Sequence, residues 1–327
     1  MAFKNSFKFA PAEWLPFQDQ EVLDSVINED MYARQGKNFE NPDFELKIVF
    51  DVHDYFAIDL MQRIRMSDIN DEKLVLVLTC PENATFISLT EALNKYNISC
   101  RNVHIFFTTE YANQDADVAP WQSPYSRAGK FMKYFYERLK AELRMPMEQI
   151  HFWTKENTNT YSDELAKVGG ADVVYTSLSW SGGICGTIDP ETFPAKTMEE
   201  FTKMGSRLVT PMAEAIAYDS LRGMFGFSGD IGNVPPRSVT IGPKDLMAAK
   251  EWIDVEFLVG CGGVSHQKHQ LRLSLFGPVC PQIPGSLMRL HKGKCYVSPT
   301  VAAAINSLPD HEGLIEKIEA IRQKEER

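Results

Sequence analysis

The run Leu74-Val-Leu-Val-Leu-Thr79, followed by the polar turn Cys80-Pro-Glu-Asn-Ala-Thr85, is the stretch that best predicts the fold. The apolar residues of the run follow one another without alternation, which is typical of a strand buried on both faces of a sheet. The turn leads into a helical stretch. A buried strand, a short loop and a helix in this order predict one unit of a parallel α/β sheet.

Further apolar runs repeat this pattern and alternate with helical stretches. The other predicted strands are Leu46–Phe50, Val103–Thr108, Ile150–Thr154, Asp172–Leu178, Ser238–Gly242, Val255–Gly260 and Cys295–Val297. The predicted helices are His53–Arg65, Ser123–Leu143, Met212–Leu221, Pro243–Trp252, His266–Phe276 and Pro309–Arg327. The alternation predicts a doubly wound α/β fold, in which a mostly parallel sheet carries helices on both faces.

The first 44 residues differ from the rest, because they are rich in acidic, amide and aromatic residues and lack clear periodicity. We therefore predict an N-terminal extension over 1–44 and a single α/β domain over 45–327. Trp14, Leu15 and Phe17 are candidates to anchor this extension to the domain or to a neighbouring subunit; the alternative is a semi-ordered terminal segment.

Composition limits the possible partners. The 327 residues include 34 Lys and Arg against 44 Asp and Glu, a net charge of −10, so the chain has no overall attraction for nucleic acid or an anionic membrane. No apolar run approaches the roughly 20 residues of a membrane-spanning helix. The six cysteines form no Cys-x-x-Cys pair, which argues against a disulfide scaffold or a zinc ribbon. We expect a cytoplasmic protein whose phosphate ligands are held by a local pocket.

Candidate site residues follow the predicted strands, because ligands of such sheets bind at the carboxyl ends of the strands. Thr85 can cap a helix or bind phosphate. Glu110 follows Val103–Thr108 and suits proton transfer, or it is simply solvated. Gly182 and Gly183 permit a close approach of the backbone to a ligand, although they belong to no nucleotide-binding fingerprint.

A second candidate group follows Val255–Gly260. His266 and His269 flank Lys268 at the start of a predicted helix, a pattern that suits an anion site or a solvated helix start. A metal site is less favoured, because the sequence fixes no acidic partner for the histidines.

Several motifs appear in the order typical of one family. Ser286-Leu-Met-Arg-Leu-His291 resembles the Ser-x-Leu-Gln-Leu-His segment of glucosamine-6-phosphate deaminases (isomerases). Val234-Pro235 with Val239–Gly242, and Glu110-Tyr111 with Ser123–Ser126, resemble three further motifs of that family. From about residue 45 to 305 the chain thus resembles these deaminases, which share their fold with 6-phosphogluconolactonases.

The chain departs from the family at the catalytic positions. The aspartate that serves as the family's base falls on Thr109, and its Asp-Gly-His element places Gly182 and Ile184 at the aspartate and the histidine. The glutamate that supports this histidine falls on Asp189. The phosphate loop Pro-Thr-Gly-Gly-Thr-Pro is replaced by Pro81–Phe86.

Cations of the family's phosphate site are better matched, since its lysine falls on Lys268 and its arginine on Arg222. The resemblance implies a sugar-phosphate isomerase or deaminase that acts on or binds an aminohexose or hexose 6-phosphate. It implies no metal and no organic cofactor, and it allows a homo-oligomer. Glu110 or Asp189 would then replace the lost base, and His266, His269 or His291 the lost acid. The alternative is a non-catalytic, phosphosugar-binding or structural member; a lactone or ester hydrolase is a weaker third hypothesis.

Overall fold

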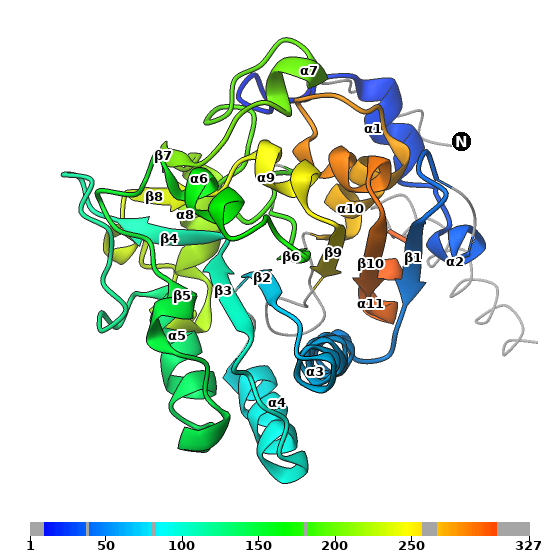
Figure 1. Ribbon diagram of the computed structural model, residues 1–327. Helices are drawn as coiled ribbons and strands as arrows, with labels where there is room; N and C mark the ends of the chain where they lie inside the picture. Colours follow the sequence, from blue (N-terminus) through cyan, green and yellow to red (C-terminus); the bar gives the residue numbers. More distant parts are fainter. Residues whose placement is uncertain (1–9, 37–38, 80–82, 180–181, 257–266, 306–327) are drawn as a thin grey trace, which may run out of the picture.

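The structure is a computed structural model that describes residues 10–36, 39–79, 83–179, 182–256 and 267–305. Within these ranges the chain forms a seven-stranded sheet with the strand order β1-β10-β9-β6-β2-β3-β5, in which all paired strands are parallel. Its strands are β1 (Phe44–Ile48), β2 (Leu74–Leu78), β3 (Val103–Phe107), β5 (Ile150–His151), β6 (Val173–Thr176), β9 (Glu251–Glu256) and β10 (Gly293–Val297). Helices flank this sheet (Figure 1), so the predicted α/β fold is confirmed.

The described helices are mostly short. They are α1 (Gln20–Val26), α2 (Met31–Arg34), α3 (Val52–Asn70), α4 (Asn83–Tyr96), α5 (Arg127–Phe131), α6 (Tyr161–Lys167), α7 (Met198–Phe201), α8 (Ala213–Ser220), α9 (Pro243–Ala248), α10 (Gln267–Phe276) and α11 (Pro299–Ala302). Among these described helices, none is long and apolar enough to cross a membrane. The predicted helix Pro309–Arg327 lies outside the described residues.

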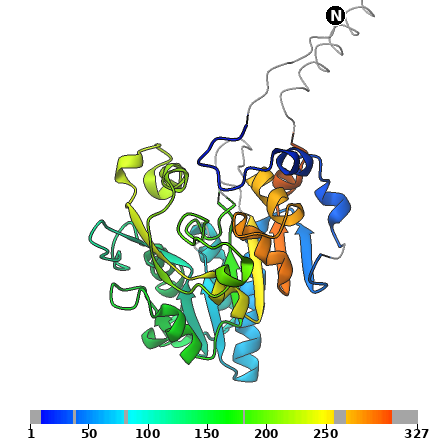
Figure 2. The same ribbon diagram turned by 90° about the horizontal axis from the view of Figure 1, so that it is seen from above.

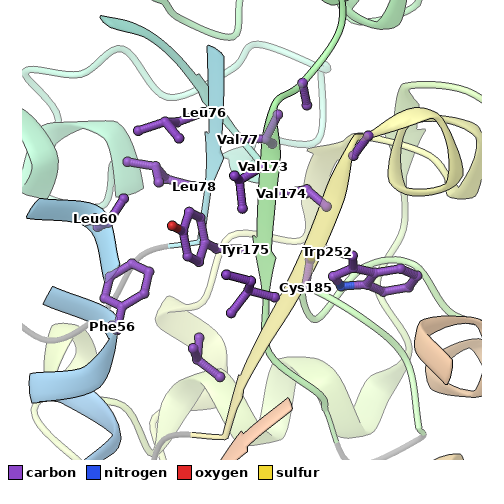
Figure 3. Packing of buried hydrophobic residues seen from close by; sticks show 14 of the residues in the cluster. Phe56, Leu60, Leu76, Val77, Leu78, Val173, Val174, Tyr175, Cys185 and Trp252 are labelled. Carbon is purple, nitrogen blue, oxygen red and sulfur yellow. The ribbon is translucent and has the colours of Figure 1, made fainter. Parts of the chain in front are cut away.

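The core follows from the alternation of side chains along the strands. Every residue of β2 is buried, as its uninterrupted apolar run predicts. In β6, Tyr175 points towards Phe56 and Leu60 of α3, whereas Trp252 of β9 lies on the opposite side of the sheet (Figure 3). Both faces of the sheet centre are therefore covered.

The N-terminal region forms two short helices despite its lack of periodicity. Aspartates begin both: the side chain of Asp19 accepts hydrogen bonds at the start of α1, and that of Asp30 does so at the start of α2. Val26 of α1 packs with Leu273 of α10 and with Ile283. In Figure 2 these blue helices lie beside the orange segment from α10 to β10, at the opposite end of the molecule from the yellow-green segment that contains α8.

One strand prediction and one helix prediction are wrong in their details. The run Ser238–Gly242 does not join the parallel sheet; it forms β8 (Arg237–Thr240), the central strand of a three-stranded antiparallel sheet with β4 (Thr109–Ala112) and β7 (Arg207–Val209). The helix predicted over Pro243–Trp252 ends at Ala248, because the chain pairs with β6 from Glu251 onward and with β10 from Trp252 onward. Acidic side chains inside β9 interrupt its apolar run, so the hydropathy pattern does not predict the first half of this strand.

The long helix predicted over Ser123–Leu143 is also wrong. The hydroxyl of Ser126 accepts the Gly129 amide, which starts α5 at Arg127. After five residues the helix continues as a π-helix over Met132–Tyr136 and then ends. A Cβ atom at Gly129 would lie 2.3 Å from the Trp121 carbonyl oxygen, so the preceding loop packs directly on the helix and requires glycine there.

Candidate active site

The segment Leu178–Asp189 follows β6 at the carboxyl edge of the larger sheet. Isolated bridges join Leu178 to Ile184 and Ile184 to Ile188, which folds the described part of the segment back on itself. Ile184 is completely buried. Cys185 is buried with φ of +59°, and burial raises the pKa of its thiol, so it does not resemble an activated nucleophile.

Gly182 and Gly183 contact other parts of the protein. The Gly182 carbonyl accepts a hydrogen bond from the Gly285 amide (3.0 Å), and φ of Gly182 is +74°. A Cβ atom at Gly183 would lie 3.0 Å from the Ile188 carbonyl oxygen. The positive φ accounts for Gly182, and tight packing within the loop accounts for Gly183. A ligand-binding role for both glycines stays a prediction.

Asp189 lies at the end of this segment with its side chain buried. Its Oδ1 accepts the amide and the hydroxyl of Thr192, both at 3.1 Å. Among the described residues no donor reaches Oδ2. Burial raises the pKa of this carboxyl to about 7, and the nearby charges of Glu214 and Glu191 add to the shift. Asp189 thus combines a buried oxygen that has no donor among the described residues with a pKa suited to proton transfer near neutral pH.

Helix α8 leads from Asp189 towards a group of cations. Glu214, in its first turn, has a buried Oε1 that no donor among the described residues reaches, and burial raises the pKa of its carboxyl. One turn later on the same face, Tyr218 is buried. The guanidinium of Arg222 lies 5.7 Å from the centre of the Tyr218 ring.

The cations gather around Asp219 of α8. Its carboxylate accepts the Tyr111 hydroxyl (2.6 Å) and forms ion pairs with Arg127 (3.0 Å) and Arg222 (3.4 Å). Together with Lys130 and Met224, the tyrosine and both arginines line a small cavity. Two arginines thus pair with one carboxylate and Lys130 lines the same cavity, so positive charge is in excess there.

A larger groove adjoins this basic cavity and shares Lys130 and Met224 with it. Its volume is about 500 Å³, within the range of small-molecule sites. Trp121, Lys133 and Asn83 contribute to its walls. The groove thus links the basic cavity to the start of α4.

Glu110 is placed differently from a base that awaits a substrate. It is buried, and four donors surround its carboxylate at 2.7–2.9 Å: its Oε1 accepts the amides of Tyr111 and Arg127, and its Oε2 accepts the Ser126 hydroxyl and the Ala128 amide. Burial raises its pKa, and the four hydrogen bonds oppose this shift. The geometry favours the bracing of the α5 N-terminus, with no acceptor position left for a substrate.

Replacement of Glu110 by Gln is therefore expected to lower stability by about 1–3 kcal/mol, because an amide nitrogen would face two of the donors that the carboxylate now accepts. A shift of the urea midpoint measures this effect. Ligand affinity should stay within about threefold of the parent value at temperatures where both proteins are folded. A fully stable variant that had lost all turnover would instead assign Glu110 to proton transfer.

Thr85 lies within the first turn of α4, and its hydroxyl is 2.9 Å from Nδ1 of His53. Sequence reasoning did not select His53, which lies near the start of α3. The two side chains connect the N-terminal turns of α3 and α4, and phosphate binding by Thr85 stays a prediction.

The remaining predicted residues are not brought to Asp189 in the described part of the chain. Lys268 lies on α10 and lines neither the basic cavity that contains Arg222 nor the adjoining groove. His269 interacts with the Leu23 backbone, and burial lowers its pKa. His291 contacts the Lys292 carbonyl oxygen (2.8 Å). His266 lies outside the described residues.

Sequence reasoning missed two acidic residues of β9, Asp254 and Glu256, which are completely buried at the carboxyl end of the strand. The available signal was their alternation with apolar residues in Trp252-Ile-Asp-Val-Glu256. Within the described ranges, no group of three or more His, Cys, Asp or Glu side chains is arranged to hold a metal ion.

Comparisons with known proteins place this geometry in context. No protein-family model matches the chain. It is 25% identical over 166 residues to a glucosamine-6-phosphate deaminase of Lachnoclostridium phytofermentans, a match that covers 49% of this chain and 62% of that relative, hence less than two thirds of the relative's length. It is 22% identical over 208 residues to the deaminase of Fusobacterium nucleatum, which covers 61% of this chain and 68% of the relative.

Solved structures agree. A monomeric glucosamine-6-phosphate deaminase superimposes with a TM-score of 0.62 at 16% identity, over 80% of this chain and 99% of that one. The 6-phosphogluconolactonase of Thermotoga maritima gives a TM-score of 0.54 at 12% identity, over 78% and 99%. The resemblance stated from the motifs is thus confirmed: the chain has the fold that these two kinds of protein share, and it is similar in sequence to the deaminases.

Proposed function

We propose that this chain, similar in sequence to glucosamine-6-phosphate deaminases, is a sugar-phosphate isomerase or deaminase that acts on a hexose or aminohexose 6-phosphate. Asp189 carries the proposal. It is a buried carboxyl with one oxygen lacking a donor in the described part and a pKa of about 7. In the proposed reaction the Asp189 carboxylate takes the proton from C2 of the open-chain sugar and returns it to C1.

Thr109 and Ile184 cannot perform this proton transfer. The Thr109 hydroxyl donates to the Val239 carbonyl oxygen (2.8 Å) and has no acid–base chemistry near neutral pH. Ile184 is an apolar, completely buried side chain. We therefore assign the proton transfer to Asp189.

The spacing along α8 supports a phosphosugar. Glu214, which influences the pKa of Asp189, and Asp219, which holds the arginines, are five residues apart, or ~7.5 Å along the helix axis. This distance is comparable to that between C2 and the phosphate of an extended hexose 6-phosphate.

The test is a screen of hexose and hexosamine 6-phosphates and 6-phosphogluconate. Thermal shift measures binding, and assays for aldose–ketose conversion and for ammonia release measure turnover. Conversion of a 6-phosphate with or without ammonia release supports the proposal. Binding without turnover would support the non-catalytic alternative, and neither binding nor turnover would overturn the proposal.

Replacement of Arg222 by Met is expected to raise the Kd of the phosphorylated ligand about tenfold or more, because hydrogen bonds to charged groups contribute about 1.5–3 kcal/mol. Affinity for the corresponding unphosphorylated sugar should not change. Arg237→Met in β8 is the control, since Arg237 lines no described cavity next to Asp219. Equal losses of affinity for both ligands would argue against a phosphate role for Arg222.

A further inference from the structure

The two buried carboxyl groups of β9 have no compensating cation in the described part of the chain. Asp254 and Glu256 alternate along the strand and so share one face of the sheet, opposite to the face on which Tyr175 meets α3 (Figure 3). Glu251, at the start of the same strand, differs because it forms an ion pair with Arg63 at 2.8 Å. Within the described ranges Asp254 and Glu256 have no such partner.

Asp254 and Glu256 contact groups on β6, β10 and the segment that follows β6. The Thr176 hydroxyl donates to Asp254, and the Cys295 thiol lies 3.9 Å from its Oδ2. Oε1 of Glu256 accepts the Leu178 amide (3.0 Å), at the start of the segment that ends in Asp189. Oε2 of Glu256 is buried and has no donor among the described residues, and the charge of Asp254 acts on Glu256. Because an ionised carboxylate only accepts hydrogen bonds, a proton on Oε2 of Glu256 would give this buried oxygen a hydrogen to donate towards Asp254.

Three titratable groups that interact with the pair are themselves neutral at neutral pH. Burial raises the pKa of the Cys295 thiol in β10, of the Cys185 thiol in the loop and, to about 12, of the Tyr218 phenol in α8. Burial and the adjacent Asp254 charge raise the pKa of Glu256 well above its usual range. Two ionised carboxylates at this place would repel each other in a medium of low dielectric constant.

We propose that Asp254 and Glu256 hold one proton between them at neutral pH, and that this protonated pair fixes the start of the Leu178–Asp189 segment. Glu256 is then a positioning residue for Asp189, a step that rests on the proposed function. Loss of the shared proton would place a second negative charge beneath the loop, and repulsion between the two carboxylates would displace Glu256 from its position at the Leu178 amide.

Infrared spectroscopy tests the shared proton without any substrate. At pH 7 the parent protein should show the C=O stretch of a buried, protonated carboxylic acid that does not exchange rapidly with bulk solvent. Glu256→Gln should lose this band, and Asp254→Asn should keep it. A difference spectrum between the parent and Glu256→Gln without a carboxylic acid band would overturn the proposal.

Stability as a function of pH is the second measurement. A raised pKa in the folded state means that stability is lost as the pH rises through that pKa. The parent protein should therefore lose several degrees of Tm as the pH rises from the ordinary carboxyl pKa of about 4.5 into the alkaline range, and Glu256→Gln should lose clearly less over the same range. Parallel curves for the two proteins would show that Glu256 holds no proton that the fold depends on.

The positioning role has its own readout. Glu256→Gln should keep kcat within about threefold at pH 7 and keep it at alkaline pH, where the parent protein declines. A uniform loss of kcat at all pH values would indicate a merely structural role and would overturn the positioning step. Failure of the proposed function would leave no turnover to measure, but the infrared and stability results would stand independently.

Discussion

Asp189→Asn is expected to reduce kcat about 10²–10⁴-fold on whichever hexose 6-phosphate the parent protein converts fastest. A positioned general base contributes rate factors of this size, and the amide cannot accept a proton at neutral pH. The variant keeps an acceptor oxygen for Thr192, so the local structure has no reason to change. Ligand affinity, measured by titration calorimetry, should stay within a few-fold of the parent value.

A catalytic base at Asp189 predicts how activity and stability change with pH. With a pKa of about 7, Asp189 is ionised above neutrality, so kcat/KM of the parent protein should rise with pH through neutrality, below the alkaline range in which the Asp254–Glu256 pair loses its proton. Stability should show the opposite trend, because a carboxyl whose pKa is raised in the folded state destabilises the fold as the pH rises from about 4 to 7. Asp189→Asn should therefore gain Tm relative to the parent at pH 8 and lose this advantage at pH 4.

Glu191 provides the matched control. Its exposed carboxylate also raises the pKa of Asp189, yet it lies at the surface. Glu191→Gln should change kcat less than threefold and move the rise of kcat/KM to slightly lower pH. If Asp189→Asn retained parental kcat, proton transfer would have to be assigned to another group.

The sequence predicted the larger sheet well wherever burial is continuous. In β2 every side chain faces a helix layer or a neighbouring strand, so apolar residues occupy every position and the pattern is unmistakable. β9 lies between two strands as β2 does, but Asp254 and Glu256 interrupt its apolar run. A hydropathy pattern cannot distinguish a carboxyl that is neutral inside a protein from one that is charged in water.

The candidate site was predicted less completely, because its parts depend on contacts between distant segments. Asp189 was selected by alignment with a supporting residue of the family, but its burial next to Glu214 comes from the packing of α8. Arg127 was not selected, since only the fold brings it to Asp219, 92 positions away. Glu110 was selected for its position after a strand, and the donors that occupy its carboxylate come from the turn that begins α5.

The largest expected loss of stability follows the replacement of Arg272 by Ala. Its guanidinium is buried in α10 and donates five hydrogen bonds, all to backbone carbonyl oxygens. Those carbonyls belong to Glu29, Lys268, Val301, Ala302 and Ala303. The side chain thus joins the N-terminal segment, α10 and α11, and its removal leaves several acceptors without a donor as well as a cavity.

We expect Arg272→Ala to lower the free energy of unfolding by about 3–5 kcal/mol, and Tm by roughly 6–20 °C, because each buried acceptor left without a partner is costly. Arg272→Lys should lose less, since an ammonium group keeps the charge and three of the five donors. Arg65→Ala on the exposed face of α3 is the control and should change stability by less than about 0.5 kcal/mol. Hydrogen exchange separates two explanations of a small loss: faster exchange confined to α1 and α2 would mean that the N-terminal helices detach while the sheet stays folded, whereas unchanged exchange throughout would show that the five hydrogen bonds contribute little to the fold.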